Sequence, residues 1–558
     1  MRATAEEIQM AKQLFNRWVG LIFISMGISL VIIDGTIVNT IFPTVIKALS
    51  LTSTQVQWVQ ESYVLVFASL LLIWGSLADR YGRRAMLVLG VIIFVAASMW
   101  AGTSTSADSM IMARIVQGIG GSMVLPTTLS LVNANFQGRE RGIAFAIWGS
   151  TIGGMVAIGP VIGGWLATAF TDGWRLAFNV NLPIGIIIVL GVLLAVPESR
   201  GDNKHDGIDI VGAALSVVMF FSLVFGLIEG RTYGWWNVNK QFELGDFKWA
   251  TSGISIIPVA LAVSILATVL FVAWEKHRAK LSKSVLLDLN LFKLASFRNG
   301  SIAALIISMG EFGVIFALPL WLQNVEGLSA VDSGLVLLWL AGGAFLASGA
   351  AGSMSGKVAP AMVVRVGVLL ELLGVVGTAF AIGMDAGWRW VAPCLLAYGI
   401  GVGFATAQLT GVIMIDVNPA MAGQASGSQS TVRQIGSALG IAVIGTTLFT
   451  ATQNILLDKL DALKLNPQFF SSSVKQGITD AVVDSSGGAI PGLKAQLVAQ
   501  SQGMLPAGTA QKVAEAAGSA FSEGAKWAAL AAAVFLFLGL LSTFNLTSKQ
   551  HSEGSHAE

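Results

Sequence analysis

The sequence contains few of the residues that build disulfide frameworks, metal sites and polar surfaces. Cys394 is the only cysteine, so a disulfide framework within the chain and a cysteine-based metal site are both excluded. Charged residues make up 11% of the chain, against about 25% in a soluble domain. Hydrophobic residues make up 54%, and the mean hydropathy is +0.74. This composition excludes an ordinary soluble domain and indicates a protein that crosses a membrane many times.

The sequence also lacks the patterns of several functional classes. It has no nucleophile–base arrangement and no metal-ligand spacing, so we expect no enzyme, no metal and no cofactor. The Gly356-Lys357 pair has neither the glycine spacing nor the following Ser or Thr of a phosphate-binding loop, which argues against an ATP-driven pump. The formal net charge of +2 indicates no particular partner, and a nucleic-acid partner is not expected.

In place of these features the chain has 63 glycines and long apolar runs. Because small residues let helices approach closely inside a membrane, the glycines favour tight helix packing. Apolar segments of ~20 residues, long enough to span a bilayer, occur about fourteen times. We expect spans near 18–43, 55–77, 85–103, 108–134, 142–169, 178–197, 207–228, 250–274, 299–321, 332–355, 361–383, 388–413, 424–450 and 526–546.

The distribution of lysine and arginine predicts the orientation of these spans. With the N-terminus inside, roughly 19 of these cations fall on the inner side and roughly 6 in short outer loops. Both termini are therefore expected to be cytoplasmic. The apolar run from Trp18 to Phe42 is too long for a cleaved signal and lacks a small-residue cleavage pattern, so we expect it to remain as the first span.

Two regions interrupt the rhythm of spans. The basic segment Lys276–Arg298 contains an amphipathic stretch, Val285–Leu294, that we expect along the inner membrane surface. The long polar segment Ala451–Lys526 separates the last two spans, and we expect it outside the membrane. Its pieces Ser471–Val483 and Ala507–Phe521 have helical periodicity, and Gly- and Pro-containing turns separate them.

The most specific motif is the loop Gly75–Arg84, between the second and third spans. An ordinary positive-inside loop would explain its arginines but not its spacing of Gly, Asp and Gly. The pattern G-x-L-A-D-R-x-G-R-R resembles the signature loop of the major facilitator superfamily. The resemblance implies a conformational latch made by Gly75, Asp79, Arg80, Gly82, Arg83 and Arg84.

The first span contains Asp34-Gly-Thr-Ile-Val-Asn39-Thr-Ile-Phe-Pro43, which resembles the D-x-T-I-V-N-x-x-x-P signature of the fourteen-helix drug:proton antiporter group. A carboxylate inside an apolar span is a candidate functional group. In the fourth span, the run from Arg114 to Gly118 resembles the superfamily's R-x-x-x-G pattern, whose arginine supports proton exchange. For both charges, a purely structural ion pair is the alternative.

The depths of these charges favour pairing. Asp34 lies ~24 Å above the inner start of the first span, and Arg114 lies ~9 Å below the outer start of the fourth. In a hydrocarbon core of ~30 Å the two reach similar depths. Glu61, also ~6 residues below the outer edge, is expected to join them in proton coupling, unless it is an exposed residue at the membrane edge.

The fifth span contains small residues at four-residue spacing, which form a groove for a partner helix. Its G-x-x-x-G-P-x-x-G-G element resembles the motif associated with antiporters and largely absent from symporters. The residues concerned are Gly149, Gly153, Gly159, Pro160, Gly163 and Gly164.

In the second half, Glu311 lies near the middle of the ninth span, which corresponds to the first span if the two halves are repeats. We interpret it as a candidate for binding a lipophilic cation, with a protonated structural glutamate as the alternative. Glu371 is also mid-span and is left undecided. Aromatic faces for cations could come from Trp58, Tyr63, Trp148, Phe312, Phe316 and Trp339, unless these face lipid.

Further similarity to the fourteen-helix drug exporters lies in Trp174–Gly185, Leu318–Gly327 and Ala425–Gly436, so the resemblance covers nearly the whole chain. It implies an all-α polytopic membrane protein with the major facilitator fold, made of two pseudo-symmetric six-helix bundles plus two extra helices. The expected parts are a cytoplasmic N-terminus (1–17), a first bundle (18–200), two inserted helices (201–275), a cytoplasmic linker (276–298), a second bundle (299–546) containing the insert 451–526, and a cytoplasmic tail (547–558).

The implied function is proton-coupled antiport that exports lipophilic, often cationic, drugs or dyes across the inner membrane of a bacterium by alternating access. The expected partners are these small substrates, protons and membrane lipids. The chain is expected to be a monomer, and the insert could dock an accessory protein or shield the outer cavity mouth. The alternatives are an exporter of an endogenous metabolite or lipid, and a membrane scaffold or sensor that binds without transporting.

Overall fold

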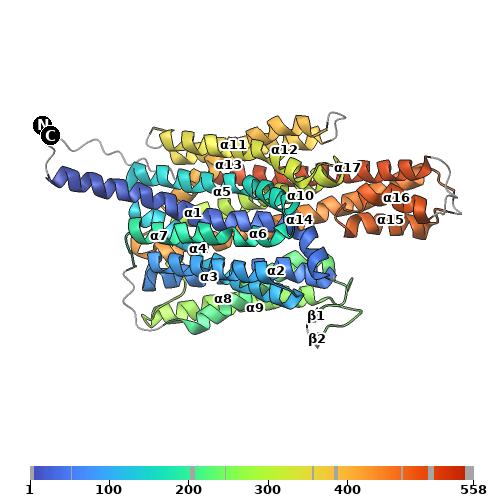
Figure 1. The fold of residues 1–558 in the computed structure, drawn as a ribbon. Helices are drawn as coiled ribbons and strands as arrows, with labels where there is room; N and C mark the ends of the chain where they lie inside the picture. Colours follow the sequence, from blue (N-terminus) through green and yellow to red (C-terminus); the bar gives the residue numbers. More distant parts are fainter. Residues whose placement is uncertain are drawn as a thin grey trace.

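The computed structural model describes residues 5–51, 53–201, 208–244, 247–354, 357–382, 387–466, 469–500 and 508–546. These residues are almost entirely helical (Figure 1). The elements are α1 Ala5–Leu49, α2 Ser53–Tyr81, α3 Arg83–Thr103, α4 Ala107–Asn135, α5 Gly138–Ala169, α6 Gly173–Asn179, α7 Asn181–Ala195, α8 Ile210–Tyr233, β1 Glu243–Leu244, β2 Phe247–Lys248, α9 Ile256–Lys280, η1 Leu289–Lys293, α10 Ala295–Asn324, α11 Ala330–Met354, α12 Pro360–Ala381, η2 Gly387–Trp390, α13 Val391–Ile413, η3 Pro419–Met421, α14 Ala422–Ala462, α15 Ser472–Asp484, α16 Ile490–Gln500 and α17 Thr509–Thr543.

The expected spans correspond to helices. Within the described residues, 13 helices are long and apolar enough to cross a membrane. The span expected at 142–169 is the 32-residue helix α5. Side-chain caps fix several helix starts in the loops, where the first N–H groups have no partner inside the helix. Ser106 accepts from the amide of Ser109 at the start of α4, and Ser255 accepts from the amide of Ile257 at the start of α9.

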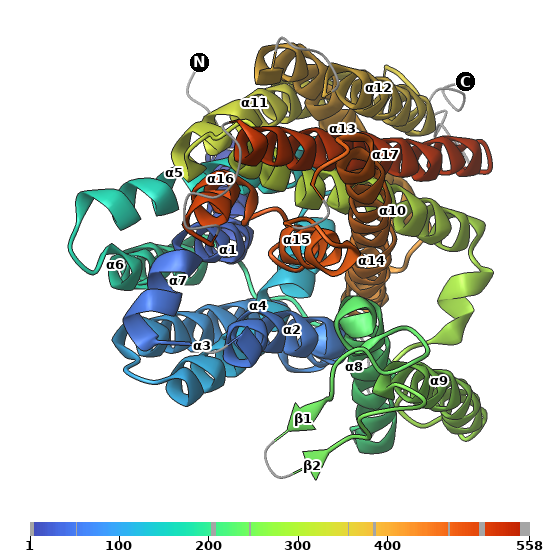
Figure 2. The same ribbon diagram turned by 90° about the vertical axis from the view of Figure 1, so that its right-hand side faces the viewer.

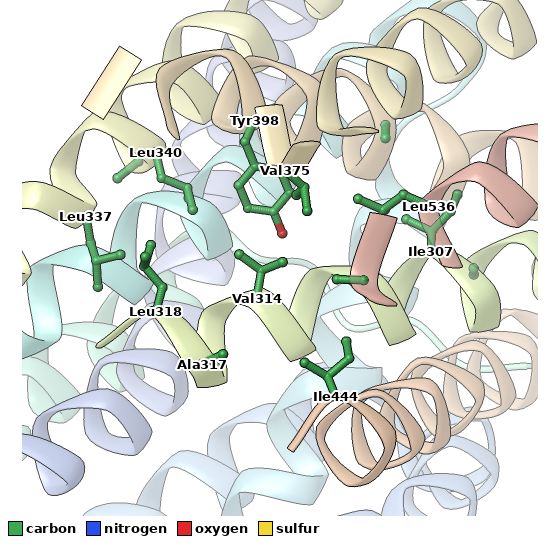
Figure 3. Close-up of a cluster of buried hydrophobic side chains, with 14 of the residues drawn as sticks. Ile307, Val314, Ala317, Leu318, Leu337, Leu340, Val375, Tyr398, Ile444 and Leu536 are labelled. Carbon is green, nitrogen blue, oxygen red and sulfur yellow. The ribbon is translucent and has the colours of Figure 1, made fainter. Parts of the chain in front are cut away.

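The helices form two bundles and an added pair that packs on the side of both. Helices α1 to α7 pack on one another, as do α10 to α14 with α17, and the pair α8–α9 packs against α2 and α14. The two bundles meet along α5 with α11 and along α2 with α14. Apolar side chains fill the interior of each bundle. Figure 3 shows this core in the second bundle, where Tyr398 points from α13 toward Val314 on α10.

The two ends of the helix array differ. Helix α1 begins and α17 ends at the same end of the molecule (Figure 1), which we call the terminal face. The opposite end, which we call the distal face, is turned toward the viewer in Figure 2 and carries α15, α16 and the β1–β2 hairpin. In this hairpin Glu243 pairs with Lys248. It lies just before α9, which begins at Ile256 rather than near residue 250 as expected.

The insert expected at 451–526 is a helical extension of the second bundle. Helix α14 continues without a break to Ala462, and α15 corresponds to the helix expected at 471–483. The sequence prediction was incomplete in two respects. Helix α16 was not expected, and the helix expected at 507–521 is the first part of α17, which continues into the last span. The four helical pieces lie side by side at the distal face, where α17 buries Val513, Ala517 and Phe521.

The linker before α10 also differs from expectation. The stretch 285–294 was expected along the inner membrane surface, but it packs into the protein, and its residues Leu289–Lys293 form a short 3₁₀ helix. Its leucines Leu286, Leu287 and Leu291 are buried in the protein core. The backbone is fixed by two side chains, because the amide of Leu286 donates to Glu275 at 3.1 Å and that of Asp288 donates to Gln424 at 3.1 Å.

Candidate transport site

A buried ion pair lies inside the first bundle. Arg114 on α4 donates to Asp34 on α1, with 3.0 Å between Nη1 and Oδ2. The side chains are 3% and 1% exposed. The structure thus brings together the two charges whose depths in their spans match. An isolated charge in this setting would be costly, so each charge offsets the desolvation of the other.

Polar neighbours complete the environment of this ion pair. Asn181 on α7 donates to Asp34 Oδ1 at 2.8 Å and to Ser98 on α3 at 2.8 Å. Arg114 also donates to Gln117 at 2.6 Å, and its guanidinium lies 4.3 Å from the ring centroid of Tyr63. Sequence reasoning did not assign roles to Asn181 and Gln117, although each is a polar residue within a motif that carries the family resemblance.

Glu61 takes a different place from the one expected. Among the described residues its acidic neighbour is Glu229 on α8, whose side chain lies within hydrogen-bonding reach. Glu229 is 2% exposed, and its Oε2 has no hydrogen-bond partner among the described residues. The position of Glu61 is therefore defined by α8, one of the two inserted helices, and not by Asp34 and Arg114.

The second bundle has its own ion pair, between a buried acid and a half-buried arginine. Arg433 on α14 donates to Glu311 on α10, with 3.3 Å between Nη2 and Oε2. Thr406 on α13 donates to the other carboxylate oxygen at 3.5 Å, and the hydroxyl of Tyr398 donates to the Glu311 carbonyl at 3.2 Å. A small cavity lies against this group, lined by Ala304, Ile307, Ser308, Glu311, Ala405, Thr406, Leu409 and Arg433. Sequence reasoning placed Arg433 in a motif but did not foresee that it pairs with Glu311.

A further carboxyl group lies near this pair. Glu371 on α12 is fully buried, and neither of its carboxyl oxygens has a hydrogen-bond partner among the described residues. It interacts electrostatically with both Glu311 and Arg433. Two acids therefore share one arginine, so this region favours an additional positive charge, either a proton or a cationic ligand.

The six aromatic residues proposed as cation-binding faces do not gather at one site in the structure. Tyr63 lies under Arg114, and Trp148 is buried and donates to Thr128 at 3.2 Å. Trp58 packs on Phe242 near the inserted helices. Phe312 and Phe316 are half-buried on α10, and Phe316 contacts Phe449 of α14. Trp339 is 49% exposed, on an apolar stripe of α11 that includes Leu335 and Leu338.

The signature loop binds the two bundles together at the terminal face. Asp79, at the end of α2, accepts from the amides of Gly423 at 2.8 Å and Gln424 at 3.0 Å, in the first turn of α14. Arg83 donates to Asp79 at 2.7 Å and to the carbonyl of Pro419 at 2.7 Å. The carboxylate thus meets the partial positive charge of a helix N-terminus in the opposite bundle.

The glycines of this loop allow close contact. A Cβ atom on Gly75 would lie 2.5 Å from the carbonyl oxygen of Gly423, so α2 and α14 touch through backbone. Gly82 has a φ of 117°, and a Cβ atom there would lie 2.7 Å from the carboxyl carbon of Glu198. That carboxylate accepts from the amide of Arg84 at 3.0 Å, at the start of α3. Arg80 lines a pocket beside Asp209 at the same face.

The glycines of α5 contact both bundles. A Cβ atom on Gly159 would overlap Thr36 Oγ1 on α1, and one on Gly163 would lie 3.2 Å from the carbonyl oxygen of Ile37. Gly149 faces Ala407 on α13, and a Cβ atom on Gly164 would overlap Val331 on α11. The structure describes the backbone of Gly153 and Pro160 as part of α5, and their side chains lie outside the described set.

Two bundles of membrane-crossing helices that meet face to face, each with charged groups in its interior, are the architecture of a membrane transporter. The family model of the Major Facilitator Superfamily matches residues 24–441, and the chain belongs to this superfamily. The similarity to solved structures extends over the whole fold. The human organic anion transporter MFSD10 (TETRAN) matches with a TM-score of 0.58 at 12% identity, over 94% of this chain and 99% of that one.

Curated relatives are named as exporters and transporters. The probable actinorhodin transporter of Streptomyces coelicolor is 32% identical, over 78% of this chain and 73% of the relative. The tetracenomycin C resistance and export protein of Streptomyces glaucescens is 28% identical, over 93% and 91%. The riboflavin transporter RibZ of Clostridioides difficile is 28% identical, over 76% and 87%.

Proposed function

We propose that this protein is a proton-coupled antiporter that exports lipophilic, often cationic, drugs or antibiotics from the cytoplasm by alternating access. The observation that carries the proposal is that each bundle holds an acid–arginine pair in the middle of its membrane-crossing helices, Asp34–Arg114 and Glu311–Arg433. The names of the actinorhodin and tetracenomycin C relatives support export of such compounds. The lysine and arginine bias supports a cytoplasmic terminal face, with the insert on the outer side.

Asp34 is the proposed proton carrier. While it is ionised, it accepts from Arg114 and Asn181 and holds α1 against α4 and α7. Protonation removes the negative charge and weakens both contacts, because an ionised acceptor makes the stronger hydrogen bonds. Arg114 then keeps Gln117 and the ring of Tyr63 as partners. A change of protonation at one atom can therefore alter how three helices pack, which links proton binding to conformation.

Glu311 and Glu371 are the proposed groups that attract substrate. They share the single arginine Arg433, so a cationic ligand beside them would complete the charge balance. The small cavity beside Glu311 is lined by four apolar and four polar side chains, so a lipophilic molecule carrying one positive charge would find both kinds of contact once the cavity widens. Because protons and cations compete for the same carboxyl groups, ligand binding at this site would release protons.

The Asp79 contacts are the proposed latch. They close the terminal face, since they join the end of α2 to the start of α14 across the two bundles. Opening this face requires that the carboxylate leave the α14 N-terminus, and closing it restores three charge-assisted hydrogen bonds, two of them from backbone amides. In alternating access, these bonds would form when the terminal face closes and break when it opens.

A second candidate is export of an endogenous metabolite, which the riboflavin transporter relative favours. One experiment tests both functions. The purified protein is reconstituted in liposomes with an imposed pH gradient, and transport is measured for a panel of cationic dyes, neutral drugs and flavins. Gradient-driven dye transport that excess flavin does not inhibit would support the drug exporter. Transport that is indifferent to the gradient would rule out proton antiport.

A further inference from the structure

We propose that Glu61 and Glu229 form a second proton-binding site, whose shared proton holds α2 against the inserted helix α8 and favours closure of the distal face. Only the effect of this proton on transport rests on the proposed alternating-access function. The proton site itself is argued from the position, burial and surroundings of the two carboxyl groups.

The two acids come from different structural units. Glu61 lies in α2 of the first bundle, and Glu229 lies one turn before the end of α8. Their side chains are within hydrogen-bonding reach of each other. Glu229 is 2% exposed with an unpartnered Oε2 among the described residues, so the group lacks a donor that would stabilise two full negative charges.

The surroundings favour a shared proton. Trp58, Phe225, Tyr233 and Phe242 pack on one another beside the pair, in an apolar cluster that joins α2 to the inserted helices. Lys240 from the loop after α8 supplies one positive charge, and the Tyr233 hydroxyl also interacts with both acids. No other charged group from α9 or α14 acts on the pair among the described residues. One cation and two carboxylates leave one negative charge, which a single proton removes while bridging the two groups.

The position of the pair couples it to movement. Helix α8 also binds the second bundle, because the Arg231 guanidinium lies 3.8 Å from the ring centroid of Phe449 and donates to the carbonyl of Val483 at 3.1 Å. These contacts hold α8 to α14 and α15 at the distal face. If α8 remains with the second bundle, distal opening separates the half-buried Glu61 from Glu229 and exposes the buried Glu229 to water. Proton binding from the distal side then favours reclosure, and loss of the proton favours opening.

The first test detects the proton. Infrared difference spectra of the purified protein in lipid nanodiscs should contain the carbonyl band of a protonated carboxyl group near neutral pH. The Glu61→Gln/Glu229→Gln variant should lose part of this band, whereas the exposed hairpin control Glu243→Gln should not. An unchanged band in the double variant would overturn the proposal. This measurement needs no substrate, so absence of dye export in liposomes would count against the proposed function and leave this result standing.

The second test follows movement. In a Cys394→Ser background, spin labels at Thr105 and Ser252, exposed in the α3–α4 and α8–α9 loops, report the distance between the first bundle and the inserted pair. We expect the wild-type distance to lengthen as pH rises. In Glu229→Gln the distance should stay short at every pH, because the amide donates to Glu61 in place of the proton. In Glu229→Ala the distance should stay long, and in Glu243→Gln it should change with pH as in the wild type. A wild-type pH response in Glu229→Gln would refute the shared-proton contact between Glu61 and Glu229.

Discussion

Asp79 accepts a hydrogen bond of 2.8 Å from the backbone amide of Gly423, a residue 344 positions later in the chain. This bond joins the last turn of α2 to the first turn of α14, and so connects the two bundles at the terminal face. It depends on Gly75 and on Gly423 itself, because a side chain at either position would push the two backbones apart. The signature loop therefore does more than supply positive charge near the membrane.

Replacing Asp79 by Asn should weaken this latch without changing the shape of the side chain. Removing one partner of a buried, hydrogen-bonded ion pair costs about 3–5 kcal/mol and leaves Arg83 with an uncompensated charge. We expect transport to fall at least about tenfold, while a cysteine introduced at Ser426 becomes more reactive from the terminal side. The control is Asp108→Asn, which removes an exposed acid at the distal start of α4. Unchanged reactivity at position 426 would show that Asp79 does not keep this face closed.

The change Asp34→Asn should uncouple transport from the proton gradient. The Asn side chain cannot exchange a proton, although it still fits between Arg114 and Asn181. In liposomes, dye transport should become independent of an imposed pH gradient, while downhill exchange of substrate continues. Asp108→Asn again serves as the control. Transport by the Asp34 variant that follows the gradient as in the wild type would contradict the assigned role.

Sequence patterns were sufficient for the helical architecture and for the Asp34–Arg114 pair, because helix rise converts residue spacing into depth. Depth alone does not say which helix lies next to which. Glu61 has nearly the depth of Arg114 but faces α8, whose packing against α2 is a tertiary feature. Glu229 was not among the predicted site residues, because it follows the apolar run expected to end at residue 228.

The same limit applies in the second bundle. Glu311 corresponds to Asp34 by repeat position, and a symmetric partner would come from α13, the counterpart of α4. The structure instead supplies Arg433 from α14, the counterpart of α5. The two halves thus use different helices to neutralise equivalent acids. A repeat argument predicts the acid correctly and gives no information on its partner.

The change Glu311→Gln should reduce affinity for permanently cationic substrates more than for neutral ones. The amide keeps the size of the side chain and its contact with Thr406, but removes the negative charge that faces the small cavity. We expect a loss of about tenfold for the cations, equivalent to ~1.4 kcal/mol, and a smaller change for neutral compounds. Fluorescence binding titrations on both classes would measure this. Equal losses for both would indicate a structural role, as would an equal effect of Glu326→Gln, the control two residues beyond the distal end of α10.

The change Gly159→Leu should block transport while the protein still inserts in the membrane. A Cβ atom at this position overlaps Thr36 Oγ1, two residues after Asp34 on α1, so the larger side chain would push α5 away from α1 next to the proton site. Gly154→Leu is a matched control on the same helix, because no atom lies within 4 Å of a Cβ atom built there. Transport should be normalised to the amount of protein in the membrane. Full turnover in the Gly159 variant would show that close contact between α1 and α5 is not required.

Replacing residues 463–508 by a short flexible linker should preserve proton-driven exchange and change substrate range or affinity. This deletion removes α15 and α16, and with them the contacts of Val483 with Arg231 and of Ser486 with Asn324. The distal ends of α8 and α10 would then lose a common support, although the two ion pairs inside the bundles remain. Because α14 and α17 continue beyond the bundles toward the insert, the linker should join Ala462 to Thr509 so that both helices keep their length.

Transport in liposomes across a panel of substrates would measure the effect of the deletion. Gly492→Ala in the intact insert is the control, since a Cβ atom there meets nothing within 4 Å. Two results would count against a covering role: an unchanged substrate profile after deletion, or labelling of a cysteine introduced at Ser486 only from the cytoplasmic side.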